Sequence, residues 1–358
     1  MEKWEIVIIG GGIAGVTFGY LAQKEGFKTL LLEKKGKLLD SASGVAGAFL
    51  FPKVGLDTPY TRFINQGILE GLEFWEKLGV GVEKSGVLIL PRDEKDRVKF
   101  AKYRTQITLP FEEREGGFFF PDGGVVSVEG VRKVMERELN WQGKEEATQL
   151  EETPQGWIIN GKYLANKVIL AEGAEGNFLP QYLQIYPVWG ERIGLKTDFS
   201  PPYHLHKQVS ISTNRNGIVK IGATHKRNCF QCKENWEEVE ELLEKARKIA
   251  PITGEVVDIK GGFRASSRDY WAVVGEVIDL KRSLEFDPQL LKGQPPRKGV
   301  IYRKNLYILN GMGARGFSNS VITGKYLLQL IKGQISPDPH LSPLRHFIRY
   351  VRKFYPKG

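Results

Sequence analysis

The stretch IVIIGGGIAG, residues 6–15, most constrains what this chain can fold into. Its apolar start predicts a buried strand, and the residues from Ile13 to about Glu25 predict a helix. The glycines between them fit the G-x-G-x-x-G spacing. In that spacing Gly10 permits the tight turn, Gly12 lets the backbone approach a pyrophosphate, and Gly15 lets helix and strand pack closely. The helix N-terminus offers free N–H groups and a positive dipole end to phosphate. The pattern therefore predicts a dinucleotide-binding turn.

A second strand and an acidic residue follow this turn. The run Lys28–Glu33 predicts the strand, and Glu33 ends it about 20 residues after the glycines, where an acidic side chain holds an adenosine ribose. The alternative is an ordinary turn with coincidental glycines, which leaves the agreement of strand, turn, helix and acid unexplained. We expect the dinucleotide to contact Gly10, Gly12, Ile13, Ala14, Gly15, Glu33 and Lys34.

Length and composition are those of an ordinary globular protein. At 358 residues, with 41% hydrophobic and 26% charged residues, the chain predicts about two domains. No apolar run approaches the roughly 18 residues of a membrane span, and the first strand starts too early to leave room for a signal or transit peptide. We therefore expect a cytoplasmic protein. The two cysteines, Cys229 and Cys232, exclude a disulfide scaffold.

The chain is basic, with 52 Lys and Arg against 42 Asp and Glu and a net charge of +10. This charge permits a polyanionic partner such as RNA, although solubility alone also favours a net charge away from zero. Cations gather in the segments 292–304 and 335–358, and the second, a basic C-terminal tail, interleaves them with aromatic residues. Such a tail suits tRNA binding as well as it suits a solvated amphipathic helix, so both alternatives stay open.

The pattern of the opening turn recurs late in the chain. Residues 306–310 predict a buried strand, 311–318 a glycine turn and 319–331 a helix, and 167–174 add another buried strand with a glycine turn. This order predicts an α/β protein (α+β overall) with a Rossmann-like nucleotide-binding domain and an inserted β-sheet-rich substrate domain. The expected segments are 1–81, 125–182 and 304–334 for the first domain, and 82–124 and 183–303 for the second.

Four motifs give the chain a resemblance to the FAD-dependent D-amino-acid-oxidase superfamily, which includes glycine and sarcosine oxidases. They are the opening turn with Glu33, ASG at 42–44 before Gly47, GFR at 262–264 before RD at 268–269, and GMGARG at 311–316. Within the superfamily the chain is most similar to the oxidase half of the bifunctional enzymes that make 5-methylaminomethyl-2-thiouridine in tRNA. Further matches to that half are Ala48, Pro52, Ile221–Thr224, Arg227 and Ala265–Ser267.

The resemblance covers the chain up to about Gly333, and it comes with departures. The methyltransferase half of the bifunctional enzymes has no counterpart here, so the resemblance implies a stand-alone oxidase. Val45 stands where an asparagine is usual, and Ala272 stands where a proline is usual. Because both positions are expected near the flavin and the substrate, these departures leave the exact substrate open.

The cofactor that the resemblance implies is FAD. Covalent attachment is not expected, because no cysteine lies near Gly262 or Gly311, where covalently flavinylated relatives carry one or where the flavin ring lies. Besides the residues of the opening turn, the implied FAD contacts are Ser41, Ala42, Ser43, Gly44, Gly47, Ala171, Gly173, Gly311, Gly313, Ala314, Arg315, Gly316 and Phe317.

The activity that the resemblance implies is oxidation of a C–H bond next to an amine nitrogen, by hydride transfer to flavin N5. Arg264 matches the arginine that binds a substrate carboxylate, and its alternative is a surface ion pair. Arg315 matches a position close to the flavin, where it would stabilise negative charge on the reduced ring. Lys220 matches by spacing a lysine that helps dioxygen react in sarcosine oxidases, and its alternative is a solvated strand lysine. Candidates for stacking on a base, or for core aromatics, are Trp189, Tyr203, Tyr270 and Trp271.

Three function classes remain open from the sequence. The first is an oxidoreductase acting on CH–NH groups that removes a carboxymethyl group from carboxymethylaminomethyl-uridine at the tRNA wobble position. The second is an oxidase or dehydrogenase for a small amine such as glycine or sarcosine. The third is a non-catalytic flavin-binding module that interacts with RNA.

One local pattern lies outside the resemblance. Cys229 and Cys232 form a C-x-x-C next to His225, and His204 and His206 come shortly before. Four such ligands suit structural zinc, and the cysteines alone suit a reducible dithiol. Because a lone C-x-x-C is a weak signal, two ordinary loop cysteines remain the third alternative, and no metal is expected.

Overall fold

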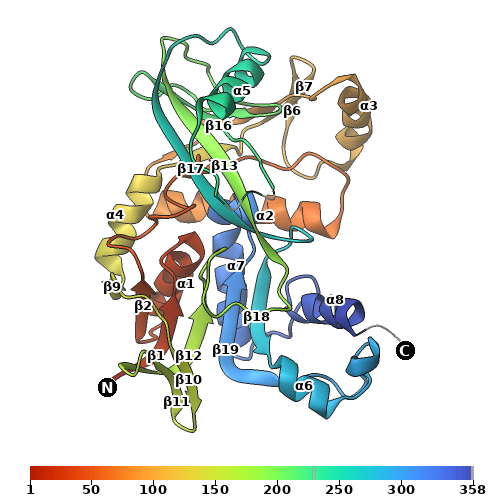
Figure 1. The fold of residues 1–358 in the computed structure, drawn as a ribbon. Helices are drawn as coiled ribbons and strands as arrows, with labels where there is room; N and C mark the ends of the chain where they lie inside the picture. Colours follow the sequence, from red (N-terminus) through yellow and green to blue (C-terminus); the bar gives the residue numbers. More distant parts are fainter. Residues whose placement is uncertain (228, 230, 356–358) are drawn as a thin grey trace.

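The computed structural model describes residues 1–227, 229 and 231–355. Figure 1 shows two lobes, with the N-terminus and the C-terminal helix in the lower one and two long crossing strands that rise into the upper one. No helix in the described part of the chain is long and apolar enough to cross a membrane.

The lower lobe is built on an eight-stranded sheet with a parallel centre. Its parallel neighbours run in the order β19, β12, β1, β2 and β9, while β18, β10 and β11 are attached antiparallel. The strands are β1 (Glu2–Ile9), β2 (Thr29–Glu33), β9 (Trp141–Gly143), β10 (Leu150–Thr153), β11 (Gly156–Ile159), β12 (Tyr163–Leu170), β18 (Val273–Ile278) and β19 (Tyr302–Asn310). The predicted Rossmann-like core is therefore confirmed, including the strand predicted at residues 306–310, which is β19.

Helices cover both faces of this sheet because its central strands are apolar on both sides. Ile6 and Ile8 of β1 lie in the cluster beneath α1, whereas Val7 and Ile9 lie in the cluster on the opposite face. The helices on the first face are α1 (Ile13–Lys24), α2 (Pro59–Lys77), α4 (Val128–Glu138) and α7 (Gly316–Ile331). Thr17 of α1 donates a buried hydrogen bond to Ser320 of α7 (3.1 Å), so the two helices that follow the glycine turns lie side by side.

The C-terminal segment forms part of the core rather than a free tail. Helix α8 (Leu344–Phe354) buries His346, Phe347 and Val351 against the second face of the sheet. The expected amphipathic helix is present, but its apolar face is covered by protein and not by solvent. The fold also contains α6 (Leu280–Phe286), which the sequence pattern did not predict, and a 3-10 turn at Leu290–Lys292.

The upper lobe is built on a second eight-stranded sheet, ordered β17-β13-β16-β15-β14-β5-β7-β6. Its longest strands, β13 (Ile185–Lys196) and β17 (Glu255–Ser267), are antiparallel and reach down toward the first sheet (Figure 1). The others are β5 (Val87–Ile89), β6 (Glu112–Arg114), β7 (Gly117–Phe120), β14 (His204–His206), β15 (Ser210–Ile211) and β16 (Ile218–Gly222). Helix α5 (Trp236–Arg247) covers one face, and α3 (Glu94–Tyr103) lies at the far end.

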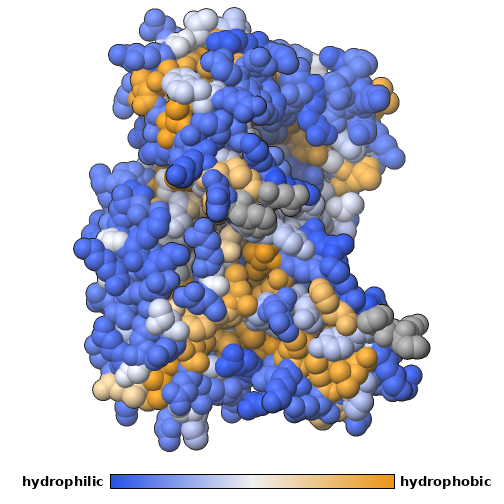
Figure 2. All heavy atoms as spheres, viewed as in Figure 1, coloured by the Kyte–Doolittle hydropathy of each residue, from blue (hydrophilic) through white to orange (hydrophobic). Residues whose placement is uncertain are grey.

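A small third sheet joins β3 (Phe49–Leu50), β8 (Gly124–Val126) and β4 (Val82–Glu83). The domain boundaries given above stay a proposal, because β18 falls within the expected segment 183–303 yet pairs with β19 in the first sheet. Figure 2 shows that the upper lobe is largely hydrophilic on this face, whereas apolar residues gather lower down, around β18 and α6.

Candidate functional site

A cavity of about 680 Å³ lies where the two eight-stranded sheets meet. Its volume is in the range of cavities that hold a whole small-molecule ligand or cofactor. Both sheets contribute to its wall, which explains why its residues come from widely separated parts of the sequence. Among the predicted cofactor residues, the wall contains Gly10, Gly12, Ile13, Ala14, Glu33, Lys34, Ser41, Ala42, Ser43, Gly47, Ala171, Gly173, Gly311, Gly313, Ala314, Arg315, Gly316 and Phe317.

The opening glycines have different physical roles. Gly10 has a φ of +113°, and a Cβ there would lie 2.4 Å from the carbonyl oxygen of Ala171. A Cβ on Gly15 would lie 2.0 Å from the Gly10 carbonyl, so Gly15 serves the packing of α1 and does not line the cavity. A Cβ on Gly12 would meet only Ser43 Oγ, at 3.5 Å. The space beside Gly12 is therefore open on the cavity side, as a bound pyrophosphate requires.

Glu33 is positioned for a ribose by two backbone donors. Its Oε2 accepts from the Gly11 N–H and its Oε1 from the Lys35 N–H, both at 2.7 Å. Each carboxylate oxygen retains acceptor capacity, since an ionised carboxylate has about four lone-pair sites. At the start of α1, Ser43 Oγ accepts from the Ile13 N–H (3.0 Å), which brings the segment after β2 against the helix N-terminus. This set of donors and acceptors fits a dinucleotide.

The late glycine turn closes the same cavity from the other side. Asn310 donates to the carbonyl oxygen of Gly173 (2.8 Å) and its Oδ1 accepts from the Gly311 N–H (2.8 Å), so one buried amide joins the two later turns. Helix α7 begins at Gly316, three residues before the predicted Asn319, because a 3-10 turn at Gly313–Arg315 leads directly into it. Gly44, a predicted contact, lies outside the wall, where a Cβ would collide with the Leu39 carbonyl oxygen.

Arg264 lies in the cavity wall on β17. Its guanidinium covers the α-carbon of Gly190 on β13, where a Cβ would come within 2.1 Å of Nη2. Nη1 donates to the carbonyl oxygen of Thr224 (3.1 Å), and no carboxylate of the described residues is within ion-pair distance. Burial lowers the pKa of Arg264, while Glu238 opposes that shift. The residue is thus a desolvated cation with free donors facing a cavity.

Arg315 is the second cation of the wall, at the start of α7. Burial lowers its pKa, and Tyr60 opposes the shift. Its charge also acts on two neighbours: the pKa values of Lys53 and His206 are lowered mainly by burial and next by Arg315, that of His206 to about 4. The part of the cavity next to Arg315 therefore favours a negatively charged group.

Lys220, the third predicted catalytic residue, does not line the cavity. It lies on β16 opposite Gly194, and burial lowers its pKa to about 8, with Arg192 as the next cause. It is therefore not the solvated strand lysine of the alternative interpretation. Arg192 is a wall residue that the sequence pattern did not reveal. It forms an ion pair with Asp258 (2.7 Å) and donates to the Val45 carbonyl oxygen (3.0 Å).

The aromatic candidates are separated in space. Trp189 lies in the wall, where its ring packs on Phe263 and its Nε1 donates to Glu191 (3.0 Å). Tyr203 is remote, because its hydroxyl donates to Glu115. Tyr270 and Trp271 lie outside the wall, in the turn after β17.

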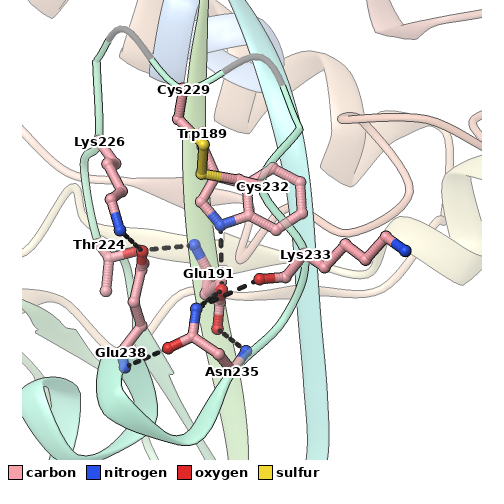
Figure 3. Close-up of a disulfide and its surroundings, with 9 residues drawn as sticks. All are labelled: Trp189, Glu191, Thr224, Lys226, Cys229, Cys232, Lys233, Asn235 and Glu238. Atoms are coloured by element: carbon pink, nitrogen blue, oxygen red, sulfur yellow. Dashed lines mark hydrogen bonds and ion pairs between the residues drawn. A yellow bond between two sulfur atoms is a disulfide. The ribbon is translucent and has the colours of Figure 1, made fainter.

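The C-x-x-C pair forms a disulfide, which Figure 3 shows beside Trp189. Two of the three histidines of the zinc alternative have other partners: His204 contacts the Glu83 carbonyl (3.1 Å) and the Thr213 N–H (3.0 Å), and His206 contacts Ser210. The third, His225, lines the cavity wall. Within the described residues, no group of three or more His, Cys, Asp or Glu side chains is placed to hold a metal ion. The pair is thus the oxidised form of the dithiol alternative.

Glu172, which the sequence pattern did not single out, carries a pH-dependent prediction. It lies in the wall, and burial raises its pKa from 4.5 to about 7, although the backbone N–H groups of Asn177 and Phe178 donate to it. A raised carboxyl pKa disfavours the ionised form in the folded state. The contribution of Glu172 to the free energy of unfolding should therefore fall as pH rises from about 4.5 to about 7, and it should level off above pH 7.

We expect Glu172→Gln to remove this dependence. Relative to the unchanged protein, the cofactor-free variant should gain on the order of 2 kcal/mol of unfolding free energy between pH 5 and pH 8. Urea unfolding at several pH values measures the difference. A difference that stays constant with pH would contradict the raised pKa.

Comparison with known proteins agrees with this geometry. Residues 5–330 match the DAO family, described as FAD dependent oxidoreductase. The tRNA 5-methylaminomethyl-2-thiouridine biosynthesis bifunctional protein MnmC of Campylobacter jejuni is 24% identical over 380 residues, covering 99% of this chain and 58% of that protein. The protein of the same name from Legionella pneumophila is 24% identical, covering 96% and 57%. The chain thus spans little more than half the length of these relatives.

Solved structures show the same fold. Glycine oxidase from Geobacillus kaustophilus superposes with a TM-score of 0.78 at 18% identity, covering 94% of this chain and 96% of that one. Iminodiacetate oxidase from Chelativorans sp. BNC1 gives 0.73 at 17% identity, covering 95% and 99%. Since the family match extends over most of the chain and the cavity wall fits the cofactor, the chain belongs to the DAO family of FAD-dependent oxidoreductases.

Proposed function

We propose that this protein oxidises a secondary amine that carries a carboxymethyl group, and that the amine is carboxymethylaminomethyl-uridine in tRNA. The observation that carries the proposal is Arg264, a desolvated guanidinium in the cavity wall with no acidic partner among the described residues. A carboxylate from the substrate would supply the missing counter-charge through a two-pronged hydrogen bond.

The reaction is a dehydrogenation followed by hydrolysis. When bound, FAD supplies the two-electron acceptor for the C–H bond next to the amine nitrogen. The substrate loses a hydride from that carbon and a proton from nitrogen, giving a C=N bond. Water then splits this bond into the shortened amine and an aldehyde that retains the carboxylate. The amine must be neutral for its lone pair to assist the departure of the hydride. The proton from nitrogen can pass to water, so no acid or base side chain is strictly required.

The residues of this chain contribute position and charge. Arg264 would fix the carboxylate so that the adjacent C–H bond points into the cavity, which converts binding energy into orientation. Arg315, desolvated in the same wall, would stabilise negative charge that develops beside it during the reaction. We keep both as proposed catalytic residues. Lys220 is retained only as a candidate that would act through Arg192, since it does not reach the wall.

The tRNA part of the proposal is supported by the name of the relatives, tRNA 5-methylaminomethyl-2-thiouridine biosynthesis bifunctional protein, and by the net charge of +10. A second candidate is an amine oxidase for a free amino acid, favoured by the similarity of the fold to glycine oxidase and iminodiacetate oxidase. A non-catalytic flavin-binding RNA module is the third.

Anaerobic mixing separates the three. The flavin-loaded protein is mixed with tRNA carrying carboxymethylaminomethyl-uridine, with sarcosine and with glycine, and flavin bleaching is followed. Bleaching by tRNA at lower concentration than by either amino acid is the expected result. Bleaching by sarcosine or glycine alone would support the second candidate, and a flavin that no amine reduces would support the third.

A further inference from the structure

We propose that Tyr270 and Arg227 form a platform at the cavity entrance on which an RNA base next to the reacting uridine stacks. This inference rests on the proposed tRNA function and adds the surface that would hold the RNA. The Tyr270 side chain is 50% exposed, so its ring is accessible to a ligand. Arg227 hydrogen-bonds to the Tyr270 hydroxyl, and its guanidinium carbon lies 5.7 Å from the Tyr270 ring centre.

Each residue of the pair is connected to residues of the cavity wall. Arg227 comes two residues after His225, which lines the wall and whose pKa is lowered by burial, then by Arg264 and by Arg227. Tyr270 is linked through its carbonyl oxygen to the Tyr60 hydroxyl (3.4 Å), and Tyr60 in turn neighbours Arg315 of the wall. A base on the platform would therefore lie within one or two residues of the cations that face the substrate.

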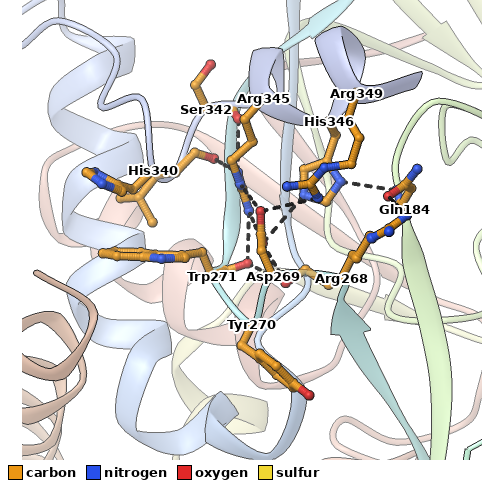
Figure 4. Close-up of polar contacts among 12 residues, drawn as sticks. Gln184, Arg268, Asp269, Tyr270, Trp271, His340, Ser342, Arg345, His346 and Arg349 are labelled. Atoms are coloured by element: carbon orange, nitrogen blue, oxygen red, sulfur yellow. Dashed lines mark hydrogen bonds and ion pairs between the residues drawn. The ribbon is translucent and has the colours of Figure 1, made fainter. Parts of the chain in front are cut away.

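Side chains of the C-terminal helix α8 contact the turn that carries Tyr270, as Figure 4 shows. Asp269 forms an ion pair with Arg345 of α8 (2.9 Å), and Arg349 lies 3.7 Å from the same carboxylate. Arg345 also donates to the carbonyl oxygens of Trp271 (3.0 Å) and Ala272 (3.1 Å). The carbonyl oxygen of Ala272 is thus bound by Arg345, and Ala272 is not among the residues of the cavity wall.

The loop that carries Arg227 is fixed as well. Its backbone pairs with β13, since Lys226 and Trp189 exchange two backbone hydrogen bonds of 2.9 and 3.0 Å. The Cys229–Cys232 disulfide lies two residues further on (Figure 3). Both halves of the platform are therefore held by the fold before any ligand binds, which reduces the ordering cost of binding.

The chemistry of the platform suits nucleic acid better than a small amine. An exposed aromatic ring stacks on any base, and an adjacent arginine adds a cation for the phosphate or for the base plane. Arg268, exposed in the same turn, adds a further cation, whereas the charge of Lys226, beside Arg227, is balanced by an ion pair with Glu238 (3.6 Å). A free amino acid is small enough to enter the cavity without contacting this exposed surface.

The test compares an anticodon stem-loop RNA carrying carboxymethylaminomethyl-uridine with the free modified nucleoside. Anaerobic flavin reduction is followed at several substrate concentrations for the flavin-loaded protein, Tyr270→Ala, Tyr270→Phe and Arg227→Ala. We expect Tyr270→Ala to raise the half-saturating concentration of the RNA about 10- to 100-fold, with a much smaller effect on the nucleoside. Tyr270→Phe keeps the ring and should stay close to the unchanged protein. Arg227→Ala should reduce the slope of log affinity against log salt by about 1.

A matched control is Phe286→Ala, which removes an aromatic ring of 44% exposure at the end of α6, in the lower lobe. This substitution should leave the half-saturating concentrations of the RNA and of the nucleoside unchanged. If Tyr270→Ala oxidises the RNA as the unchanged protein does, or loses affinity equally for RNA and nucleoside, the platform is wrong while the proposed function stands. If the unchanged protein is reduced by sarcosine and not by either uridine substrate, the proposed function fails, and the platform with it.

Discussion

Gly12→Ala is expected to give a folded protein that has lost most of its affinity for FAD. Gly12 has φ −74° and ψ 177°, values that alanine adopts without strain, and its added Cβ would meet only Ser43 Oγ at an ordinary 3.5 Å. The same methyl group would project into the space that the pyrophosphate needs. Overpacking of this kind costs about 1–3 kcal/mol, so FAD affinity should fall about 10- to 100-fold.

Titration of the cofactor-free protein with FAD, followed by flavin fluorescence, measures this loss, and thermal unfolding without FAD measures the fold. Gly15→Ala is the matched contrast, because its Cβ would lie 2.0 Å from the Gly10 carbonyl oxygen whether or not FAD is present. That variant should lose stability without FAD as well. Unchanged FAD affinity in Gly12→Ala would mean that the pyrophosphate does not approach this turn.

Arg264→Met should lower kcat/KM for a carboxylate-bearing substrate about 100- to 1,000-fold, mainly through KM. Removing one partner of a desolvated, hydrogen-bonded charge pair costs about 2–5 kcal/mol. Methionine is similar in length but carries neither the charge nor the donors. Because the guanidinium is desolvated without an acidic partner, its removal should leave the thermal midpoint of the substrate-free protein unchanged or higher.

Steady-state kinetics with the substrate identified by flavin bleaching, together with the flavin absorption spectrum, tests this expectation. Arg264→Lys is the informative companion, since lysine keeps a positive charge but cannot make the two-pronged hydrogen bond. The kcat/KM of Arg264→Lys should lie between those of the unchanged protein and Arg264→Met. Equal kinetics in all three would remove Arg264 from the substrate site and would take away the main support for a carboxymethyl substrate.

The opening turn shows what local sequence predicts well. The space that Gly10 leaves for the Ala171 carbonyl oxygen depends on a distant part of the chain, but the role of Gly15 depends on a contact within one strand, turn and helix. The spacing of the glycines was therefore enough to predict the role of Gly15. The same holds for Glu33, whose carboxylate faces the turn because β2 is the parallel neighbour of β1. Helix starts are also set locally: α4 and α5 begin directly after Ser127 and Asn235, whose side chains accept from a backbone N–H three residues on.

The C-terminal segment shows where sequence reasoning stops. Its mixture of cations and aromatic residues is compatible both with RNA binding and with a solvated amphipathic helix. The pattern therefore could not distinguish between the two. The apolar face is in fact buried by the first sheet, and Arg345 is used to hold Asp269. Only the position of a turn some 76 residues earlier in the chain decides this, and no local pattern carries that information.

The sequence by itself determined the dinucleotide class of the cofactor and the strands β1, β2, β12 and β19 of the first sheet, because a dinucleotide site depends on short, contiguous patterns of glycine, apolar residues and one acid. The tertiary structure alone decided the rest of the cavity. Glu172, after β12, and His206, at the end of β14, line the wall. Arg192 of β13 also became a wall residue, and Lys220 of β16 did not, because β13, β16 and β17 pair in one particular register. That register is fixed by the packing of side chains distant in sequence, which is why the proposed substrate site had to be found in space.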